Sequence, residues 1–215
     1  MGLRERQKQD RKHRIVASAK ELFVKQGFER TTIESIAEAA EVSGVTVHNY
    51  YGTKAGILLA LVVENDERLL DVLEEKLDEN FSDLVELTCR FSTIVQDHAL
   101  GSLEKSIWRQ VIAAVTLDAQ SPFGKAYTRL DQKLASVLVR KIEQMQKAGD
   151  VPRRVNAIDL GKALFQLQNA RFIELVRTEG LTGEDSCDHL RADLEALFLQ
   201  SATTHATNKP AVTAT

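Results

Sequence analysis

Residues 42–54, VSGVTVHNYYGTK, bring together side chains whose chemistry is hydrogen bonding. His48 and Asn49 can reach the edges of base pairs, and the Tyr50 hydroxyl can reach a phosphate. Elsewhere the chain has no phosphate-cradling glycine-rich loop, no Gly-x-Ser-x-Gly and no His-Glu-x-x-His. The residues therefore predict a protein that binds a partner and is not an enzyme.

Two other groups of residues raise the question of catalysis or metal binding. Asp97 and His98 are adjacent, yet a single histidine on a mostly apolar helix is usually structural. Asp185, Cys187 and His189 are of metal-ligating types, but positions i and i+2 do not share a face of a helix. We expect no metal ion and no cofactor.

Two short helices joined by a tight turn must position the residues of the 42–54 segment. Ser43 can cap a helix over 44–51, and Gly52 ends it. This spacing matches a helix-turn-helix, whose second helix lies in the DNA major groove. Val47 and Tyr51 align on the inward face. The outward face and its flank carry Gly44, Val45, Thr46, His48, Asn49 and Tyr50.

Residues 15–60 resemble the N-terminal domain of the TetR family of bacterial transcription regulators. The resemblance rests on a helix ending in Phe-x-x-x-Gly-Phe, followed in order by Thr-Thr, Ile-Ala, Val-Ser, Thr-Val, Tyr-Tyr and Thr-Lys. It implies a domain that binds a double-stranded DNA operator. Phosphate contacts would come from Thr32, Tyr50 and Lys54. The groove would be met by Gly44, Val45, Thr46, His48 and Asn49.

Three residues depart from the pattern of the family. Glu41 replaces the usual turn glycine, so the backbone there must avoid the left-handed region or accept its cost. Val45 replaces a frequent glycine and offers an apolar group that can meet a thymine methyl. His48 replaces the usual tyrosine. These changes leave the motif in place but leave the operator sequence open.

The composition predicts an all-α protein of ordinary globular type. Of its 215 residues, 43% are apolar and 27% charged, and only three are proline. Thr31 and Glu34 have capping-box spacing at the start of the second helix. Helices are expected at about 9–26, 31–40, 44–51, 54–77, 82–98, 103–117, 122–147, 157–178 and 184–200.

We expect three regions: an N-terminal arm and three-helix helix-turn-helix DNA-binding domain over 1–54, a larger helical ligand-binding and dimerisation domain over 55–202, and a disordered tail over 203–215. No apolar run reaches the roughly 18 residues of a membrane span, and the charged N-terminus lacks a signal-peptide core. With two widely separated cysteines, the natural reading is a cytoplasmic protein without membrane contact.

Charge is distributed unevenly along the chain. Residues 1–54 contain ten Lys or Arg against seven Asp or Glu, whereas the remainder contains eighteen against twenty-four. The first fourteen residues alone hold six basic and two acidic side chains. A basic N-terminal region on an otherwise acidic chain favours contact between that region and a polyanion, although a solvated terminus would show the same pattern.

The helix expected over 157–178 is apolar around most of its circumference, which is typical of a helix covered on two sides. We expect this helix and the last one to form a four-helix interface with a second copy, and dimerisation through the last two helices is also what the resemblance implies. The predicted interface residues are Ala157, Gly161, Leu164, Leu190, Leu194, Leu197 and Phe198.

Aromatic and polar residues mix in the middle helices, and they either line a pocket or only pack a core. The resemblance implies a small-molecule site there, and we expect a small apolar effector that releases DNA. The candidate pocket residues are Phe91, Val95, Trp108, Ile112, Tyr127, Phe165, Gln168 and Phe172. The expected function is a dimeric regulator, most often a repressor, on a palindromic operator. The alternative is a helical dimeric scaffold or protein-interaction module that has lost DNA binding.

Overall fold

The protein, in a computed structural model that describes residues 2–117 and 119–206, is all-helical. Within these residues the helices are α1 (Leu3–Gln26), α2 (Ile33–Ala39), α3 (Gly44–Tyr51), α4 (Lys54–Lys76), α5 (Leu84–Ser102), α6 (Lys105–Leu117), α7 (Pro122–Ala148), α8 (Ala157–Arg177) and α9 (Gly183–Ala206), and no strand occurs among them. The predicted fold class is confirmed.

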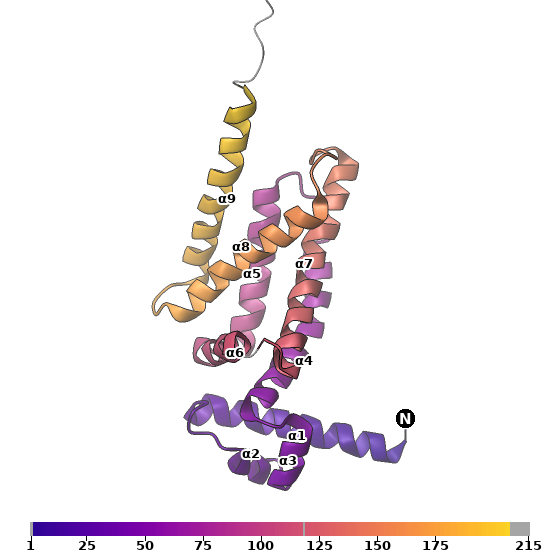
Figure 1. Ribbon diagram of the computed structural model, residues 1–215, viewed down its shortest axis with the longest axis vertical. Coiled ribbons are helices and arrows are strands. Elements are labelled where there is room, and N and C mark those ends of the chain that lie inside the picture. The colour runs from indigo at the N-terminus through magenta and orange to yellow at the C-terminus, as the bar shows by residue number, and fades with distance from the viewer. Residues whose placement is uncertain (1, 118, 207–215) are drawn as a thin grey trace, which may run out of the picture.

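The helices form a small unit at one end and a longer bundle above it (Figure 1). Helix α1 lies across the foot with α2 and α3 below it, and α4 rises from this unit into the bundle. There α7 packs along α8 and α4, while α9 lies against α5 and α8 at the outer side. Helix α4 is therefore the element shared by both parts.

Local capping sets the boundaries of the short helices. The Ser43 hydroxyl accepts a hydrogen bond from the Thr46 amide at 3.1 Å, as predicted for the start of α3. The capping box of α2 lies one residue later than predicted, because it is Thr32 that accepts from the Ser35 amide. Thr31 is instead fully buried, and its hydroxyl donates to the Gly27 carbonyl at 2.8 Å.

Both ends of the chain contain more helix than predicted. Helix α1 begins at Leu3 and not near residue 9, so the basic N-terminal segment is helical. Helix α9 continues to Ala206, so residues 203–206 of the predicted disordered tail are helical, and residues 207–215 lie outside the described part. None of the helices in the described residues is both long enough and apolar enough to span a bilayer.

The protomer itself buries most of the residues predicted for the dimer interface. A Cβ on Gly161 would lie 2.6 Å from the Val139 side chain of α7, so this glycine allows α7 and α8 of one chain to approach closely. The residues buried inside the protomer are Ala157, Gly161, Leu164, Leu190 and Leu194. These five residues pack within their own chain and present little surface to a second copy, and the interface itself stays a prediction. Leu197 remains 59% exposed and Phe198 half-buried.

Candidate nucleic-acid interface and interior cavity

Helix α3 presents the predicted groove-facing residues on the outside of the α1–α3 unit. Val47 is fully buried, whereas Val45 is 69% exposed and both His48 and Asn49 are exposed. Gly44 and Thr46 are half-buried beside them, and the Thr46 hydroxyl lies 2.8 Å from that of Ser43. The helix therefore buries one face and leaves a branched apolar group, an imidazole and an amide free to meet a surface.

The adjacent tyrosines both tie α3 to α1. The Tyr51 hydroxyl donates to the Lys12 carbonyl at 3.3 Å, and the Tyr50 hydroxyl accepts from the Arg11 side chain at 3.3 Å. The Lys12 ammonium group lies 6.0 Å from the centre of the Tyr50 ring. Tyr51 is half-buried against the core, as its inward position predicted. The two rings thus place basic side chains of α1 beside the exposed face of α3.

Thr32 and Lys54, two predicted phosphate contacts, both have structural roles in the chain. The Lys54 ammonium group donates to the Phe28 carbonyl at 2.8 Å and the Glu29 carbonyl at 3.4 Å, and it lies 4.5 Å from the Phe28 ring centre. This leaves one of its three N–H groups for another partner. The exposed Thr32 hydroxyl accepts a hydrogen bond as the α2 cap, and its own proton remains available to donate.

The turn between α2 and α3 contains a strained residue. Glu41 has a φ of 53°, in the left-handed region that the sequence had flagged. The Arg14 guanidinium of α1 stabilises this turn, since it donates to the Ala40 carbonyl at 3.0 Å and lies 3.7 Å from the Glu41 carboxylate. Arg14 also pairs with Asp10 at 3.3 Å. The turn thus forms even though Glu41, which is not glycine, must adopt a positive φ.

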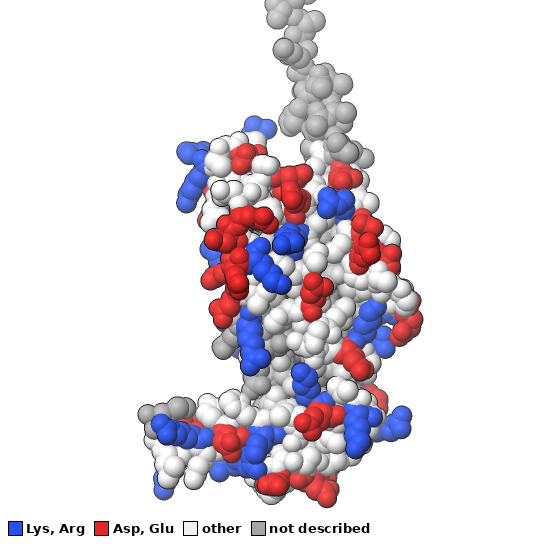
Figure 2. All heavy atoms as spheres, turned by 180° about the vertical axis from the view of Figure 1, so that it is seen from behind, with Lys and Arg blue, Asp and Glu red and all other residues white. Residues whose placement is uncertain are grey.

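The basic side chains of the N-terminal segment lie on the surface. Arg4, Arg6 and Lys8 are exposed along the first turns of α1. Figure 2 shows Lys and Arg side chains spread over the unit at the foot of the molecule, with acidic side chains among them and at its lowest edge. The unit therefore offers cations beside α3 without forming a uniformly basic surface.

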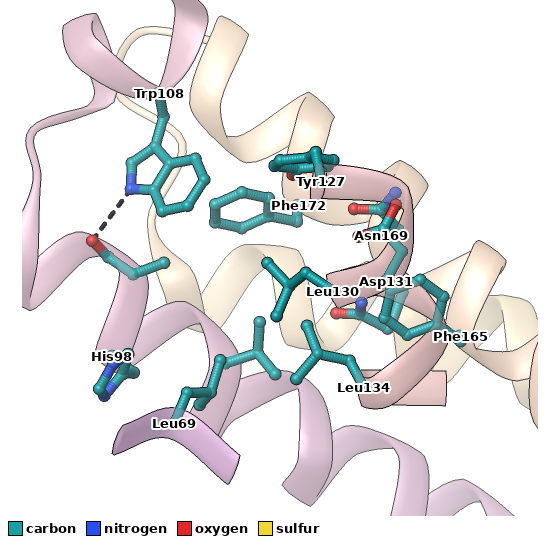
Figure 3. Close-up of a pocket in the computed structure, with 13 residues that line it drawn as sticks. Leu69, His98, Trp108, Tyr127, Leu130, Asp131, Leu134, Phe165, Asn169 and Phe172 are labelled. Atoms are coloured by element: carbon teal, nitrogen blue, oxygen red, sulfur yellow. Dashed lines mark hydrogen bonds between the residues drawn. The ribbon is translucent and has the colours of Figure 1, made fainter. Parts of the chain in front are cut away.

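An interior cavity lies where α4, α5, α6, α7 and α8 meet (Figure 3). Six of the eight predicted pocket residues line it, namely Val95, Trp108, Tyr127, Phe165, Gln168 and Phe172. Phe91 is instead fully buried and packs edge-on against Phe165, with ring centres 6.4 Å apart. Ile112 also lies outside the lining. The cavity encloses about 30 Å³, which is room for about two water molecules.

The cavity contains polar groups, of which Gln168 was among the predicted pocket residues and Asp131 was not. Asp131 of α7 lines it, and desolvation by burial raises the pKa of its carboxyl from 3.8 to about 7. Gln168 is 1% exposed, and its side-chain oxygen has no hydrogen-bond donor among the described residues. Asp131 lies four residues after Tyr127, a predicted pocket residue, and this helical spacing is the sequence signal that could have identified it.

Helix α4 connects the cavity to the helix-turn-helix. Leu69 of α4 lines the cavity. At the other end of α4, a Cβ on Gly56 would lie 2.0 Å from the Tyr51 carbonyl oxygen, so α4 and the end of α3 pack with no room for a side chain. Helix α4 therefore contacts both the cavity and the end of α3.

The remaining reactive residues do not form a site in the described part of the chain. No group of three His, Cys, Asp or Glu there is arranged to hold a metal ion. The Asp185 carboxylate accepts from the Thr182 amide and hydroxyl at 2.9 and 2.6 Å. Burial raises the pKa of the Cys89 thiol to about 11, which keeps it protonated and weakly nucleophilic.

Known proteins match this chain most clearly over the α1–α4 region. Residues 15–61 match the family model described as bacterial regulatory proteins, tetR family. The HTH-type transcriptional regulator TcmR of Streptomyces glaucescens is 38% identical over 73 residues, which are 34% of this chain and 32% of that protein. The uncharacterized HTH-type transcriptional regulator YvkB of Bacillus subtilis strain 168 is 30% identical over 112 residues, 50% of this chain and 59% of YvkB. The matches thus span less than two thirds of either relative.

Solved structures match almost the whole chain at low identity, which shows the fold. A TetR-family transcriptional regulator from Pectobacterium atrosepticum has a TM-score of 0.67 at 19% identity, covering 92% of this chain and 95% of that one. Thermus thermophilus FadR, in complex with lauroyl-CoA, has a TM-score of 0.60 at 21% identity, covering 87% and 93%. A regulator from Saccharomonospora viridis in complex with choline has a TM-score of 0.62 at 24% identity, covering 86% and 95%.

The N-terminal match and the shared fold agree with the geometry of the α1–α3 unit. A buried Val47, an exposed outer face of α3 and a capped turn before it are the parts that a helix-turn-helix needs. Residues 15–61 thus match the TetR family of bacterial regulatory proteins, and the chain shares the fold of solved regulators of that family.

Proposed function

We propose that the protein regulates transcription, as a repressor, by binding a palindromic DNA operator as a homodimer and releasing it when a small molecule binds. The observation that carries the proposal is the exposed outer face of α3, with Val45, His48 and Asn49 directed away from the protein's own core. An eight-residue helix reads only a few base pairs. Two copies related by a two-fold axis would read the two half-sites of a palindrome.

Exposed apolar side chains on the last two helices support a dimer. Ile158 at the start of α8 is 50% exposed, and Leu197 on α9 is 59% exposed. Ala163 and Ala170 are exposed along the same α8 helix, and small side chains allow a second helix to approach closely. We therefore place the proposed interface on this outer surface of α8 and α9, and not on the buried residues that the sequence suggested.

The cavity and its contact with α4 support control by an effector. A ligand needs far more room than about 30 Å³, so binding would have to separate the helices around the cavity, including α4 at Leu69. Since α4 packs tightly on α3 at Gly56 and Tyr51, this separation would shift the two α3 helices of the proposed dimer relative to each other. The ligand would then select a state that no longer fits the operator. The complexes with lauroyl-CoA and choline show that proteins of this fold bind small molecules.

In vitro selection of duplex DNA, followed by anisotropy titrations on the selected site, tests the DNA-binding part. We expect a palindromic site whose affinity falls steeply as salt increases, because several phosphate contacts release counterions. Asn49→Ala should lose roughly 1–3 kcal/mol of discrimination at one base pair. Glu143→Gln, at an exposed position in the C-terminal half of α7, is the control and should bind normally. Failure to select any duplex, or binding that does not respond to salt, would favour the alternative of a protein-interaction module.

A further inference from the structure

The interior cavity holds more hydrogen-bond acceptors than the described residues satisfy. Gln168 of α8 is almost fully buried, yet its side-chain oxygen lacks a donor in the described residues. No described side chain or amide donates to the Asp131 carboxylate of α7 either, and burial raises the pKa of that carboxyl to about 7. A buried acceptor without a donor is costly. Both costs disappear when a molecule brings N–H groups into the cavity.

The ionisable groups around Asp131 do not supply a cation for it. Helix α5 contributes His98 to the lining of the interior cavity. Helix α8 contributes Lys162 to a surface groove that Asp131 also lines. The described cavity-lining residues of α4 and α6 are Leu69 and Trp108, neither of which carries a charge. Among the described residues, desolvation is the cause that shifts the pKa of Asp131, and none of their cations offsets it. A ligand cation would give this carboxylate a charge partner that the described residues do not supply.

Four aromatic rings and several aliphatic side chains line much of the rest of the cavity (Figure 3). Trp108 and Phe172 pack edge to face, with ring centres 5.2 Å apart and planes at 86°. The indole N–H of Trp108 already donates to the Ala99 carbonyl at 3.0 Å, so the ring acts here through its apolar surface and its face. Tyr127 lies beside them. Aromatic faces attract organic cations, so the wall complements the two acceptors.

A groove on the surface between α7 and α8 offers space for the rest of the ligand. It encloses about 610 Å³, and Ala135, Val139 and Ile158 give it an apolar lining. Asp131 and Phe165 line both the groove and the interior cavity, so these two side chains form the wall between them. If Phe165 moves aside, the joined space falls in the range of about 300–1,000 Å³ that is usual for small-molecule sites.

We propose that the effector is an amphipathic organic cation whose protonated amine is held by the Asp131 carboxylate and the Gln168 side-chain oxygen, with its apolar body in the α7–α8 groove. This inference rests on the proposed control of the protein by a small molecule. It refines the small, largely apolar effector expected from the sequence, because a ligand without N–H groups would leave both acceptors without donors among the described residues.

The single tryptophan of the chain makes the test direct. Trp108 lines the cavity, so its fluorescence reports ligands that enter it. We would titrate the full-length protein at pH 8 with octylammonium, octanol and octanoate, which share one apolar chain and differ in the head group. Octylammonium should bind at least tenfold more tightly than octanol, and octanoate more weakly than both. Equal affinity of the amine and the alcohol, or no response to millimolar octylammonium, would overturn the proposal.

Variants identify the groups that hold the amine. Asp131→Asn should weaken octylammonium binding by about tenfold to hundredfold, the loss expected for a charge-assisted hydrogen bond, and leave octanol binding unchanged. Gln168→Met keeps the volume of the side chain and should weaken octylammonium binding by a smaller factor. Asp71→Asn, on an exposed position of α4, is the matched control and should bind like the original protein. Loss of octanol binding in Asp131→Asn would indicate a collapsed cavity and overturn the assigned contact.

The pH dependence separates Asp131 from His98. Amine affinity should increase from pH 5.5 to 8.5 as Asp131 ionises, and the increase should disappear in Asp131→Asn but persist in His98→Gln. The reverse pattern would assign the effect to His98 and contradict the proposal. Release of selected duplex DNA is measured separately. If octylammonium binds at Asp131 but never releases DNA, the ligand inference holds while the proposed regulation fails.

Discussion

Replacing Asp131 with Asn should stabilise the protein at neutral and alkaline pH, which is unusual for a change at a half-buried position. The folded state raises the pKa of this carboxyl from 3.8 to about 7 by desolvation. An unfolded chain therefore loses this proton near pH 4, whereas the folded chain keeps it until about pH 7. Between these values the folded state binds more protons, so the free energy of unfolding falls as pH rises. Above pH 7 the penalty is fully present.

The size of the effect follows from the shift of about three pKa units. At 1.36 kcal/mol per unit, the upper limit is about 4 kcal/mol at pH 8. Because the side chain is only half-buried and the helices can relax, we expect about 1–2 kcal/mol, or roughly 3–6 °C in melting temperature for a chain of this length. At pH 5 the difference in stability should be less than half as large, because most of the stability that the original protein loses is lost between pH 5 and pH 7.

Thermal unfolding followed by circular dichroism at pH 5 and pH 8, at one fixed protein concentration, measures this difference. Asp71→Asn serves as the control, because that side chain is exposed on α4 and should give no pH-dependent gain. The reasoning is refuted if Asp131→Asn is no more stable than the original protein at pH 8. It is equally refuted if the variant gains the same stability at both pH values.

Three further substitutions test the α1–α4 region. Gly56→Ala should destabilise the protein by about 1–3 kcal/mol in urea unfolding and abolish operator binding, because the new methyl would overlap the Tyr51 carbonyl oxygen; an unchanged midpoint would contradict the close α3–α4 contact. Glu41→Gly should be neutral or add up to about 1 kcal/mol, since glycine accepts the φ of 53°; a clear loss of stability would mean that the Arg14 contact matters more than the strain. Tyr50→Phe should weaken DNA binding by roughly fivefold, the value of one hydrogen bond, with little change in melting temperature; unaltered affinity would exclude a phosphate contact from its hydroxyl.

The sequence by itself determined the helix-turn-helix. Helix α3 begins and ends at the predicted residues because Ser43 and Gly52 act on neighbours within one turn of the chain. The inward position of Val47 and the outward position of Asn49 follow from helical spacing alone. Even the strain at Glu41 was visible, since a residue type that resists positive φ stood where the turn requires it. These features depend on contacts between residues close in sequence.

The tertiary structure decided the features that depend on distant residues. Gly161 looked suited to a partner chain, yet Val139 of the same chain fills the space beside it. The Lys54 ammonium group binds carbonyls about 25 residues away. Asp131 reads in the sequence as an ordinary helical position. Gln168 was predicted to line a pocket, but only the meeting of five helices leaves its side-chain oxygen buried without a donor among the described residues. Burial and desolvation depend on which surfaces meet in the folded chain, and helical periodicity determines only which face of each helix is available to meet another.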